Sequence, residues 1–421
     1  MLGQLLLDLS PANLRAEARR LYGKYSRKLR GLDGKVVRLP AQGEKRGAVL
    51  FSYIVDPFLI GDPARIPYSH THFWESCTIA RIWSELGFEV DCVSWTNHDF
   101  TPRQDYDVVI DVRTNLERWA PLLPRALKVL HADTAHHSFH NAAQQRRLED
   151  LARRRGSAVM QHKRLPENRA IEVADVAVVL GNRFTQGSYA FAGKPILHVP
   201  VSVPFTYPPS AGKDFEAVRR RFLWFGSGGL VHKGLDLVLE AFAGMPDHEL
   251  WVCGPIRRER DFERAYFREL YETPNIRLLG WVDVAPASFM GIAGSCLGLV
   301  YPSCSEGGGS SVYTCMHAGL LPVINFEVSV DVRPDFGVLL PRVDPESIRS
   351  AVRELSVRPS GELAAMAEAA REQARRTSSK EIFAAAYRRA AQALIDGSFR
   401  QTPPTSPLDP RELTADLGRS K

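Results

Sequence analysis

Short apolar runs alternate with amphipathic segments along most of the chain, and each run has the length of a buried strand. In the first half, the runs that we interpret as strands cover residues 48–55, 88–95, 107–112, 127–131, 173–180 and 195–203. The apolar spacing also predicts a helix from about residue 72 to 86, with Thr71 as its N-terminal cap. Continuously apolar strands that alternate with helices are typical of a parallel sheet covered on both faces.

The same alternation starts again after residues 204–215, a stretch with three prolines that we interpret as a linker. In the second half, strands are expected at residues 222–226, 249–254, 276–280, 297–301 and 321–326, and helices at 234–242, 344–357, 361–376 and 380–395. Two such units predict an α/β fold of two Rossmann-like, doubly wound parallel-sheet domains that face each other across a cleft. Ligands of these folds bind at the carboxyl ends of the strands.

The most informative stretch is residues 301–324, with the sequence YPSCSEGGGSSVYTCMHAGLLPVI. A loop containing the three glycines 307–309 precedes a short helix expected at 312–318, and the unpaired amides and the dipole of a helix start favour an anion. Glu306 lies at the mouth of this loop, where a carboxylate can accept hydrogen bonds from sugar hydroxyls but would repel a phosphate. The pattern favours a ligand with a polyol part and a phosphate part, such as a nucleotide-sugar. The alternative is an ordinary strand–loop–helix connection.

A second glycine-rich loop, Gly226-Ser227-Gly228-Gly229, follows the first strand of the second unit and offers another backbone nest for an anion. Lys233 lies just before the next helix and could add a positive charge to the same phosphates. Two anion-binding loops after different strands of one sheet suggest a diphosphate. A lysine without such partners is more often a solvated surface residue.

Three segments of the second half carry a resemblance to a known family. They are KGLDLVLEAF (233–242), NIRLLGWV (275–282) and YPSCSEGGGSSVYTCMHAGLLPV (301–323). Together they resemble the donor domain of the family-four retaining glycosyltransferases of GT-B fold, and the likeness covers most of residues 222–342. The first half matches more weakly, through ADVAVV (174–179) and Val199-Pro200, and helix 380–395 resembles the segment that crosses back to the first domain in this fold.

The resemblance implies that Lys233 holds the donor diphosphate, that Glu306 contacts the donor sugar and that His131 lies near the reacting sugar. It also implies transfer with retention at the anomeric carbon, with the nucleotide-sugar as co-substrate and no metal or other cofactor. The expected catalytic residues are Glu306, Lys233 and His131, and the expected donor-binding residues are Gly226, Ser227, Gly228, Gly229, Val282, Gly307, Gly308, Gly309, Ser310, Ser311 and Thr314.

Two positions depart from the family pattern. Thr314 stands where the family usually has a second glutamate for the ribose, and Ser227 follows Gly226 where an arginine is usual. Charge on the diphosphate would then come from Lys233, from helix N-termini, or from another residue such as Arg183 or Arg257. These departures keep one alternative open, a catalytically silent GT-B protein that binds a ligand or partner. Among enzymes, the alternative is another transferase or phosphorylase acting on a phosphorylated sugar.

Histidines cluster after the fourth predicted strand, in the stretch HADTAHHSFH (131–140). His136 and His140 are four residues apart, which suggests zinc, but there is no HExxH arrangement. We therefore expect no metal site and interpret the stretch as polar residues that line the cleft. His70 and His72 are candidates for the acceptor side, and the alternative is a helix-capping segment with a surface histidine.

Two basic regions could meet anionic partners. Residues 11–31 form an amphipathic pattern with seven Lys and Arg, which fits an anionic membrane surface or, as we favour, a solvated helix packed on the first domain. Residues 146–155, with Lys163 and Arg164, could receive a phosphorylated or lipid-linked acceptor, and a solvated helix face is again the favoured alternative.

Composition places the chain among globular proteins, with 44% hydrophobic and 24% charged residues in 421. A formal net charge of +6 suits an anionic ligand or membrane surface and is too small to argue for nucleic acid. The six cysteines include no CxxC pair, which indicates a reducing compartment. The sequence shows no signal-peptide pattern and no apolar run long enough to cross a membrane, so we expect a cytoplasmic protein, with peripheral contact at the inner face of the membrane as a further hypothesis.

We divide the chain into a basic N-terminal segment (1–45), an acceptor-side Rossmann-like domain (46–205), a nucleotide-sugar donor domain (216–379), a helix that crosses back (380–397) and a disordered tail (398–421). The function that these observations favour is that of a retaining, hexosyltransferase-like glycosyltransferase. It would move a sugar from a nucleotide-sugar to a glycan or lipid-linked acceptor, as in the biosynthesis of surface polysaccharides.

Overall fold

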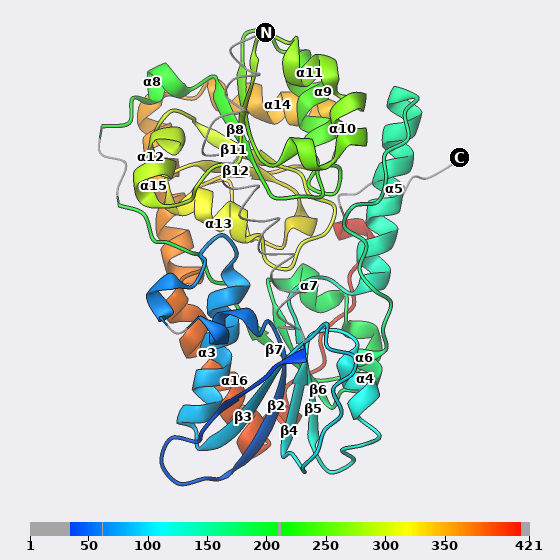
Figure 1. The fold of residues 1–421 in the computed structure, drawn as a ribbon. Coiled ribbons are helices and arrows are strands. Elements are labelled where there is room, and N and C mark those ends of the chain that lie inside the picture. Colours follow the sequence, from blue (N-terminus) through cyan, green and yellow to red (C-terminus); the bar gives the residue numbers. More distant parts are fainter. Residues whose placement is uncertain (1–33, 61, 209–211, 414–421) are drawn as a thin grey trace.

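The fold is that of a computed structural model, which describes residues 34–60, 62–208 and 212–413 (Figure 1). The basic helix expected at 11–31 lies outside the described residues, so its contact with a membrane stays a prediction from sequence. Two sheets lie one above the other in Figure 1, each with helices on both faces. The prediction of an α/β fold with two Rossmann-like domains is confirmed.

The first domain contains a seven-stranded sheet in the order β1-β3-β2-β4-β5-β6-β7, in which only β1 is antiparallel to its neighbour. Its strands are β1 (Val36–Leu39), β2 (Gly47–Tyr53), β3 (Phe88–Ser94), β4 (Val108–Asp111), β5 (Leu127–Ala132), β6 (Val176–Leu180) and β7 (Ile196–Val199). The sequence pattern did not predict β1, because an edge strand with partly exposed side chains lacks a continuous apolar run. Arg38 ties it to Asp91 of β3 with two hydrogen bonds of 2.7 and 2.8 Å.

The helices of the first domain connect these strands. They are α3 (Thr71–Glu85), α4 (Asn115–Trp119), α5 (His137–Arg155), α6 (Ala170–Val173) and α7 (Arg183–Gly187), with 3-10 turns at Asp56–Leu59, Pro63–Arg65 and Ala190–Ala192. The N-cap of α3 is His70, not Thr71 as expected, because the His70 ring accepts from the backbone amide of His72. The helical hydrogen-bond pattern thus begins one residue earlier than the hydroxyl suggested.

The second domain contains a six-stranded parallel sheet in the order β10-β9-β8-β11-β12-β13. Its strands are β8 (Arg221–Phe225), β9 (Glu249–Cys253), β10 (Ile276–Gly280), β11 (Gly298–Tyr301), β12 (Leu321–Ile324) and β13 (Val338–Leu339). Its helices are α8 (Phe215–Val218), α9 (Leu235–Ala243), α10 (Arg260–Ala265), α11 (Phe267–Tyr271), α12 (Pro286–Gly294), α13 (Ser310–His317), α14 (Pro345–Ser356) and α15 (Ser360–Thr377), with 3-10 turns at Ile256–Arg258 and Phe326–Val328. The two-residue strand β13 is too short to leave a sequence pattern.

Buried side chains on both faces of each sheet explain the continuous apolar runs. In β2, Val49 and Phe51 belong to the apolar cluster on one face, whereas Ala48 and Leu50 belong to the cluster on the other. Because alternate strand residues point to opposite faces, a strand covered on both sides must be apolar throughout. The second domain has one large cluster of its own, which includes Phe222, Leu223 and Trp224 of β8.

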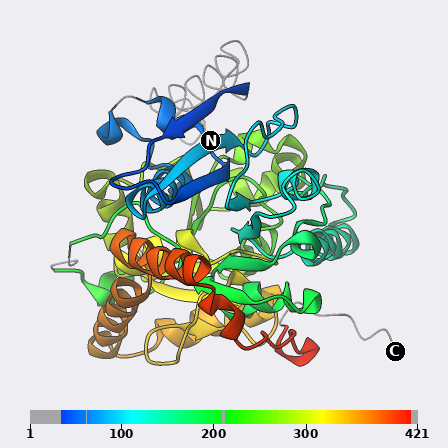
Figure 2. The ribbon, with the colours of Figure 1, turned by 90° about the horizontal axis from the view of Figure 1, so that it is seen from below.

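Helix α16 (Lys380–Asp396) leaves the second domain and packs against α3 and β7 of the first (Figures 1 and 2). Phe383, Tyr387 and Leu394 of this helix are buried in the first domain's core. The following residues to 413, expected to be disordered because of their polar and proline-rich composition, include two 3-10 turns, at Ser398–Gln401 and Pro410–Glu412. Glu412 forms an ion pair with Arg183 of α7, so specific contacts that composition does not reveal hold this part of the tail.

A second connection between the domains is made by α5 and the residues that follow it, 137–165, which we call the α5 strap. In Figure 1, α5 rises from the first domain along the side of the second. Leu148 and Leu151 of α5 join the second domain's apolar cluster. Arg154 donates to Asp236 and Glu240 at 2.7 and 2.9 Å. This basic face, for which we considered an acceptor site or solvent, is therefore largely a contact between domains.

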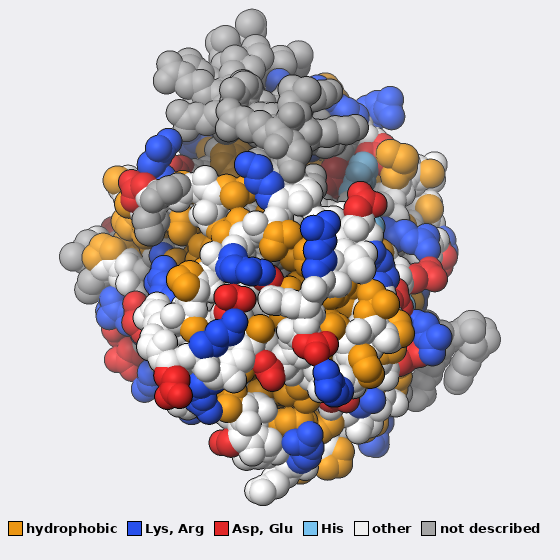
Figure 3. Space-filling view, turned by 60° about the horizontal axis from the view of Figure 1, so that its bottom comes forward, with side chains coloured by type: hydrophobic (Ala, Val, Ile, Leu, Met, Phe, Trp, Pro, Cys, Tyr) orange, Lys and Arg blue, Asp and Glu red, His pale blue; other side chains and the backbone are white. Residues whose placement is uncertain are grey.

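The surface carries charges of both signs. On the face shown in Figure 3, basic and acidic side chains are intermixed with hydrophobic ones. The basic excess of the whole sequence is thus not gathered on that face. Among the residues that the structure describes, no helix is both long enough and apolar enough to cross a bilayer.

Candidate functional site

Lys233 and Glu306, predicted from separate loops, lie in direct contact. Lys233 follows β8 and Glu306 follows β11, and these two strands are parallel neighbours in the sheet. Their carboxyl ends therefore meet at one edge. Lys233 Nζ lies 2.9 Å from Glu306 Oε1 and 2.6 Å from the hydroxyl of Tyr301.

Glu306 is held at one of its two oxygens. Oε1 also accepts from the Tyr301 hydroxyl and from Ser303 Oγ, each at 2.9 Å, and the His232 ring lies 3.6 Å away. Burial alone would raise the pKa of Glu306, but Lys233 and then His232 hold it well below its ordinary value, so the carboxylate is charged. Oε2 makes no hydrogen bond to any residue in the described ranges, which leaves it available to a hydroxyl group of a ligand.

The loop of Gly307, Gly308 and Gly309 packs directly against the first domain. A Cβ at residue 307 would overlap the carbonyl oxygen of Asp133 and lie 2.5 Å from Thr134 Cα. Gly308 has φ +125, and a Cβ there would overlap Val201 Cγ1 of the first domain. Glycine is therefore required here for a close approach between the two domains. The expected contact of these amides with a sugar or phosphate stays a prediction.

The other predicted nest, Gly226 to Gly229, already receives a carboxylate of the protein. The backbone amides of Gly229 and Leu230 donate to Glu259, the latter at 3.0 Å, and Glu259 is only 5% exposed. The amides of Ser227 and Gly228 donate to no residue that the structure describes. Glu259 was not predicted from the sequence. Its position shortly after β9, the strand next to β8, could have suggested that it lies near the loop after β8.

The first domain contributes a second charged pair, Asp133 and Arg113. Arg113 Nη2 donates to Asp133 Oδ1 at 2.5 Å, and the Tyr53 hydroxyl and the His72 ring lie 3.4 and 3.5 Å from Oδ2. Burial would raise the pKa of Asp133, but Arg113 and then His72 hold it below its ordinary value. The carboxylate therefore stays charged where the glycine loop of the second domain meets the first.

His131, expected near the reacting sugar, lies beneath this surface. It is 1% exposed and packs edge-on against the rings of Tyr53 and Tyr387, at centroid distances of 5.3 and 5.8 Å. Burial lowers the pKa of His131 to about 4, against the opposing effect of Asp133, so the ring is neutral near pH 7. Neither ring nitrogen has a partner in the described part of the chain.

Glu75 of α3 is a buried carboxyl group that sequence reasoning missed. It is fully buried, and its Oε1 accepts from the amide and the hydroxyl of Ser202 at 3.1 and 2.7 Å. Burial raises the pKa of Glu75 to about 7, although the hydrogen bonds from Ser202 oppose this. The carbonyl of Ser202 in turn accepts from Ser310 Oγ of α13, so a chain of hydrogen bonds joins the two domains.

Three other predicted residues have contacts of their own. Thr314 is buried, and its hydroxyl donates to the carbonyl of Ser310 at 2.8 Å, as in many helices, so its expected contact with the donor stays a prediction. Val282 is half-buried next to Asp283, which accepts from the hydroxyl of Tyr68 in the first domain at 3.1 Å. Arg183, considered as a source of charge for the diphosphate, is paired with Glu412.

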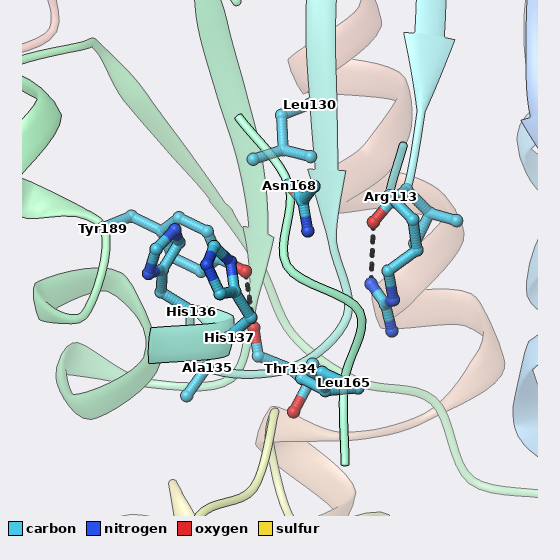
Figure 4. A pocket seen from close by; sticks show the side chains of 10 residues that line it. Arg113, Leu130, Thr134, Ala135, His136, His137, Leu165, Asn168 and Tyr189 are labelled. Carbon is cyan, nitrogen blue, oxygen red and sulfur yellow. Dashed lines mark hydrogen bonds between the residues drawn. The ribbon is translucent and has the colours of Figure 1, made fainter. Parts of the chain in front are cut away.

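The histidine stretch after β5 borders a small pocket of the first domain (Figure 4). Its lining includes Arg113, His136, His137, Asn168 and Tyr189. The His136 ring bonds Ser138 Oγ at 2.7 Å. His140 lies outside the pocket and donates to the carbonyl of Lys163 at 2.8 Å. Within the described ranges, no group of three or more potential ligands is arranged to hold a metal ion.

No known family profile matches the sequence, and no curated protein matches it. Solved structures with a similar fold include sucrose-phosphate synthase (tll1590) from Thermosynechococcus elongatus, with 13% identity and a TM-score of 0.58, over 84% of this chain and 100% of that one. A glycosyltransferase from Rickettsia africae ESF-5 has 12% identity and a TM-score of 0.55, over 84% and 99%. Anabaena Alr3699/HepE in complex with UDP and glucose has 12% identity and a TM-score of 0.53, over 83% and 100%.

At these identities the likeness concerns the fold. It takes in both sheets, since the matches cover more than four-fifths of this chain. Together with two parallel-dominated sheets and a terminal helix that returns to the first domain, it identifies the architecture: the chain has the GT-B fold.

Proposed function

We propose that the chain is a glycosyltransferase that takes a sugar from a nucleotide-sugar bound between its two domains. The observation that carries the proposal is the Lys233–Glu306 pair, which joins the carboxyl ends of two neighbouring parallel strands at the surface facing the first domain. Ligands bind at this edge in doubly wound folds. The similar fold of HepE, whose structures contain UDP or UDP-glucose, supports the choice of donor class.

Each residue of the pair has a distinct part in the proposed reaction. Lys233 would exchange its bond to Glu306 for one to the diphosphate and would stabilise the charge that develops on the leaving group. Glu306 Oε2 would accept a hydrogen bond from a sugar hydroxyl. We further propose that the acceptor, a glycan or lipid-linked hydroxyl, approaches from the side of Asp133 and His72, that it attacks from the face of the leaving group with retention, and that no metal is required.

The direct test is to incubate the full chain with UDP-, GDP-, ADP- and CDP-sugars and to measure release of the nucleoside diphosphate. We expect slow hydrolysis of one donor, which a suitable acceptor accelerates. Lys233→Ala should weaken binding of the diphosphate product by about 1.5–3 kcal/mol, the value of a charge-assisted hydrogen bond. Lys45→Ala is a matched control, since Lys45 is an exposed lysine paired only weakly with Glu89 at 3.6 Å. Equal affinities of the two variants would refute the assignment of Lys233.

Two observations favour a second candidate, a protein that binds a ligand without transferring a sugar. Glu259 occupies the amides of Gly229 and Leu230 that a phosphate would use, and the Thr314 hydroxyl is bonded inside its own helix. The same donor panel separates the two functions. Tight binding of one nucleotide-sugar with no diphosphate release, also with acceptors present, would establish the silent protein.

A further inference from the structure

Lys163, in the α5 strap of the first domain, lies over the Gly226–Gly229 loop of the second. A Cβ at Gly229 would overlap Lys163 Cγ and lie 3.3 Å from its Cβ. Gly229 also has φ +86, which a residue with a side chain rarely adopts. The lack of a side chain at Gly229 thus allows the aliphatic part of Lys163 to pack against the loop.

The backbone of Lys163 is fixed from both domains. Within the first domain, its carbonyl accepts from His140 Nε2 at 2.8 Å and its amide donates to Gln144 Oε1 at 3.4 Å. Its neighbour His162 bonds Asp261 of the second domain at 2.8 Å. The position of Lys163 over the loop therefore follows from the docking of the α5 strap and not from a free surface side chain.

The ammonium group of Lys163 has no carboxylate within 4.0 Å and no hydrogen-bond acceptor among the residues that the structure describes. The side chain is exposed, so a ligand can reach the ammonium group. A bound anion would therefore pair with Lys163 without displacing a carboxylate, whereas at Lys233 it would have to displace Glu306.

Unpaired donors lie at the same place. The amides of Ser227 and Gly228 have no partner in the described ranges, whereas those of Gly229 and Leu230 are taken by Glu259. Ser227 is exposed and Gly228 half-buried, so a ligand can reach both amides. The second domain itself supplies Lys233 but no arginine in this loop, and Arg183 is engaged with Glu412.

We propose that Lys163 supplies, from the first domain, the second positive charge for the donor diphosphate, together with the amides of Ser227 and Gly228. This inference rests on the proposed function and adds a residue to it. The diphosphate then binds to both domains at once, between Lys233 of the second domain and Lys163 of the first. Its affinity depends on the docked α5 strap.

The experiment uses the full chain and isothermal titration with UDP, GDP, ADP and CDP. Lys163→Met removes the charge but keeps an apolar stem against Gly229, and Lys45→Met makes the same change at an exposed lysine of the first domain. For the nucleoside diphosphate that the wild type binds best, we expect Lys163→Met to weaken binding about tenfold or more. Lys163→Arg should restore most of the affinity, and Lys45→Met should match the wild type.

Two other results would overturn the inference, and they have different consequences for the proposed function. If the wild type binds a nucleoside diphosphate and Lys163→Met binds it equally well, Lys163 has no part in the site while the proposed function stands. If the wild type binds none of the four diphosphates, the inference and the proposed function both fail.

Discussion

Lys233 and Glu306 neutralise each other in this structure, with Nζ and Oε1 2.9 Å apart and both side chains largely buried. The carboxylate thus depends on the lysine that we assign to the diphosphate. Binding a donor is then an exchange of anions at Lys233, in which the phosphate must compete with a carboxylate that is already in place.

The Lys233–Glu306 ion pair should make the effects of changing its two residues on the unfolding free energy strongly non-additive. Lys233→Met leaves the Glu306 carboxylate largely buried without its cation and should cost about 3 kcal/mol of unfolding free energy. The double variant Lys233→Met/Glu306→Gln should recover much of that loss, because no buried charge remains. Urea unfolding of the four proteins at pH 7 measures the coupling, and additive effects would contradict it.

The pH dependence of this coupling has a definite sign. Because the pKa of Glu306 is lowered in the folded chain, the stability it contributes is present above its ordinary pKa of 4.5 and is lost as the pH falls through the lowered value. The advantage of the wild type over Lys233→Met should therefore be largest near neutral pH and decrease in acid.

Glu75 predicts the opposite pH dependence. Its pKa is raised from 4.5 to about 7, so the folded chain binds a proton that the unfolded chain releases, and the stability linked to this proton is full below pH 4.5 and lost as the pH rises to about 7. Glu75→Gln keeps an acceptor for Ser202 without the charge. It should match the wild type near pH 4.5 and be more stable by about 3 kcal/mol at pH 8. Unfolding curves that stay parallel from pH 4.5 to 8 would contradict the buried, uncharged carboxyl group.

Local sequence patterns predicted those parts of the fold that burial on both faces makes apolar. The strand β2 and the helices α14 to α16 lie within about two residues of the expected ranges. The edge strand β1 was missed because its alternate side chains are partly exposed, and so were the helices α10 and α11, whose six and five residues are too few for a clear period. Local patterns reveal an element through its regularly spaced buried residues, and these elements have few such residues.

The site was predictable only within one sheet. Lys233 and Glu306 follow neighbouring strands, so fold topology alone brings them together. The contact of Glu259 with the Gly229 amide, and the position of Lys163 over Gly229, join residues about 30 and 66 apart in sequence that depend on loop packing and domain docking. No local pattern contains that information, which is why the α5 strap was expected to be a solvated or acceptor-binding surface.

The α5 strap predicts a measurable link between the domains. Arg154 pairs with the fully buried Asp236, and Arg155 pairs with Glu269 at 2.7 Å. Arg154→Ala/Arg155→Ala should lower the unfolding free energy by about 3 kcal/mol or more, because it leaves Asp236 short of a partner, and should increase the radius of gyration in solution. Small-angle scattering and urea unfolding measure the two effects.

The matched control for this variant is Arg153→Ala. Arg153 is 70% exposed and, among the residues that the structure describes, pairs only with Asp150 of its own helix, so its removal should change neither quantity appreciably. If the double variant scatters and unfolds like Arg153→Ala, the strap does not hold the domains together.

Gly307 predicts how tightly the two domains must meet. The atoms that an added methyl group would reach are the Asp133 carbonyl oxygen and Thr134 Cα, both of which belong to the backbone and cannot rotate away as a side chain would. Gly307→Ala must therefore move the domains apart or distort the loop that carries Glu306, at a cost of about 1–3 kcal/mol. Gly361→Ala, at a helical position with open space around it, should instead leave stability unchanged or raise it by up to about 1 kcal/mol. A Gly307→Ala protein as stable as Gly361→Ala, with wild-type binding of a nucleoside diphosphate, would show that the close approach of this loop to Asp133 is not needed by the folded protein.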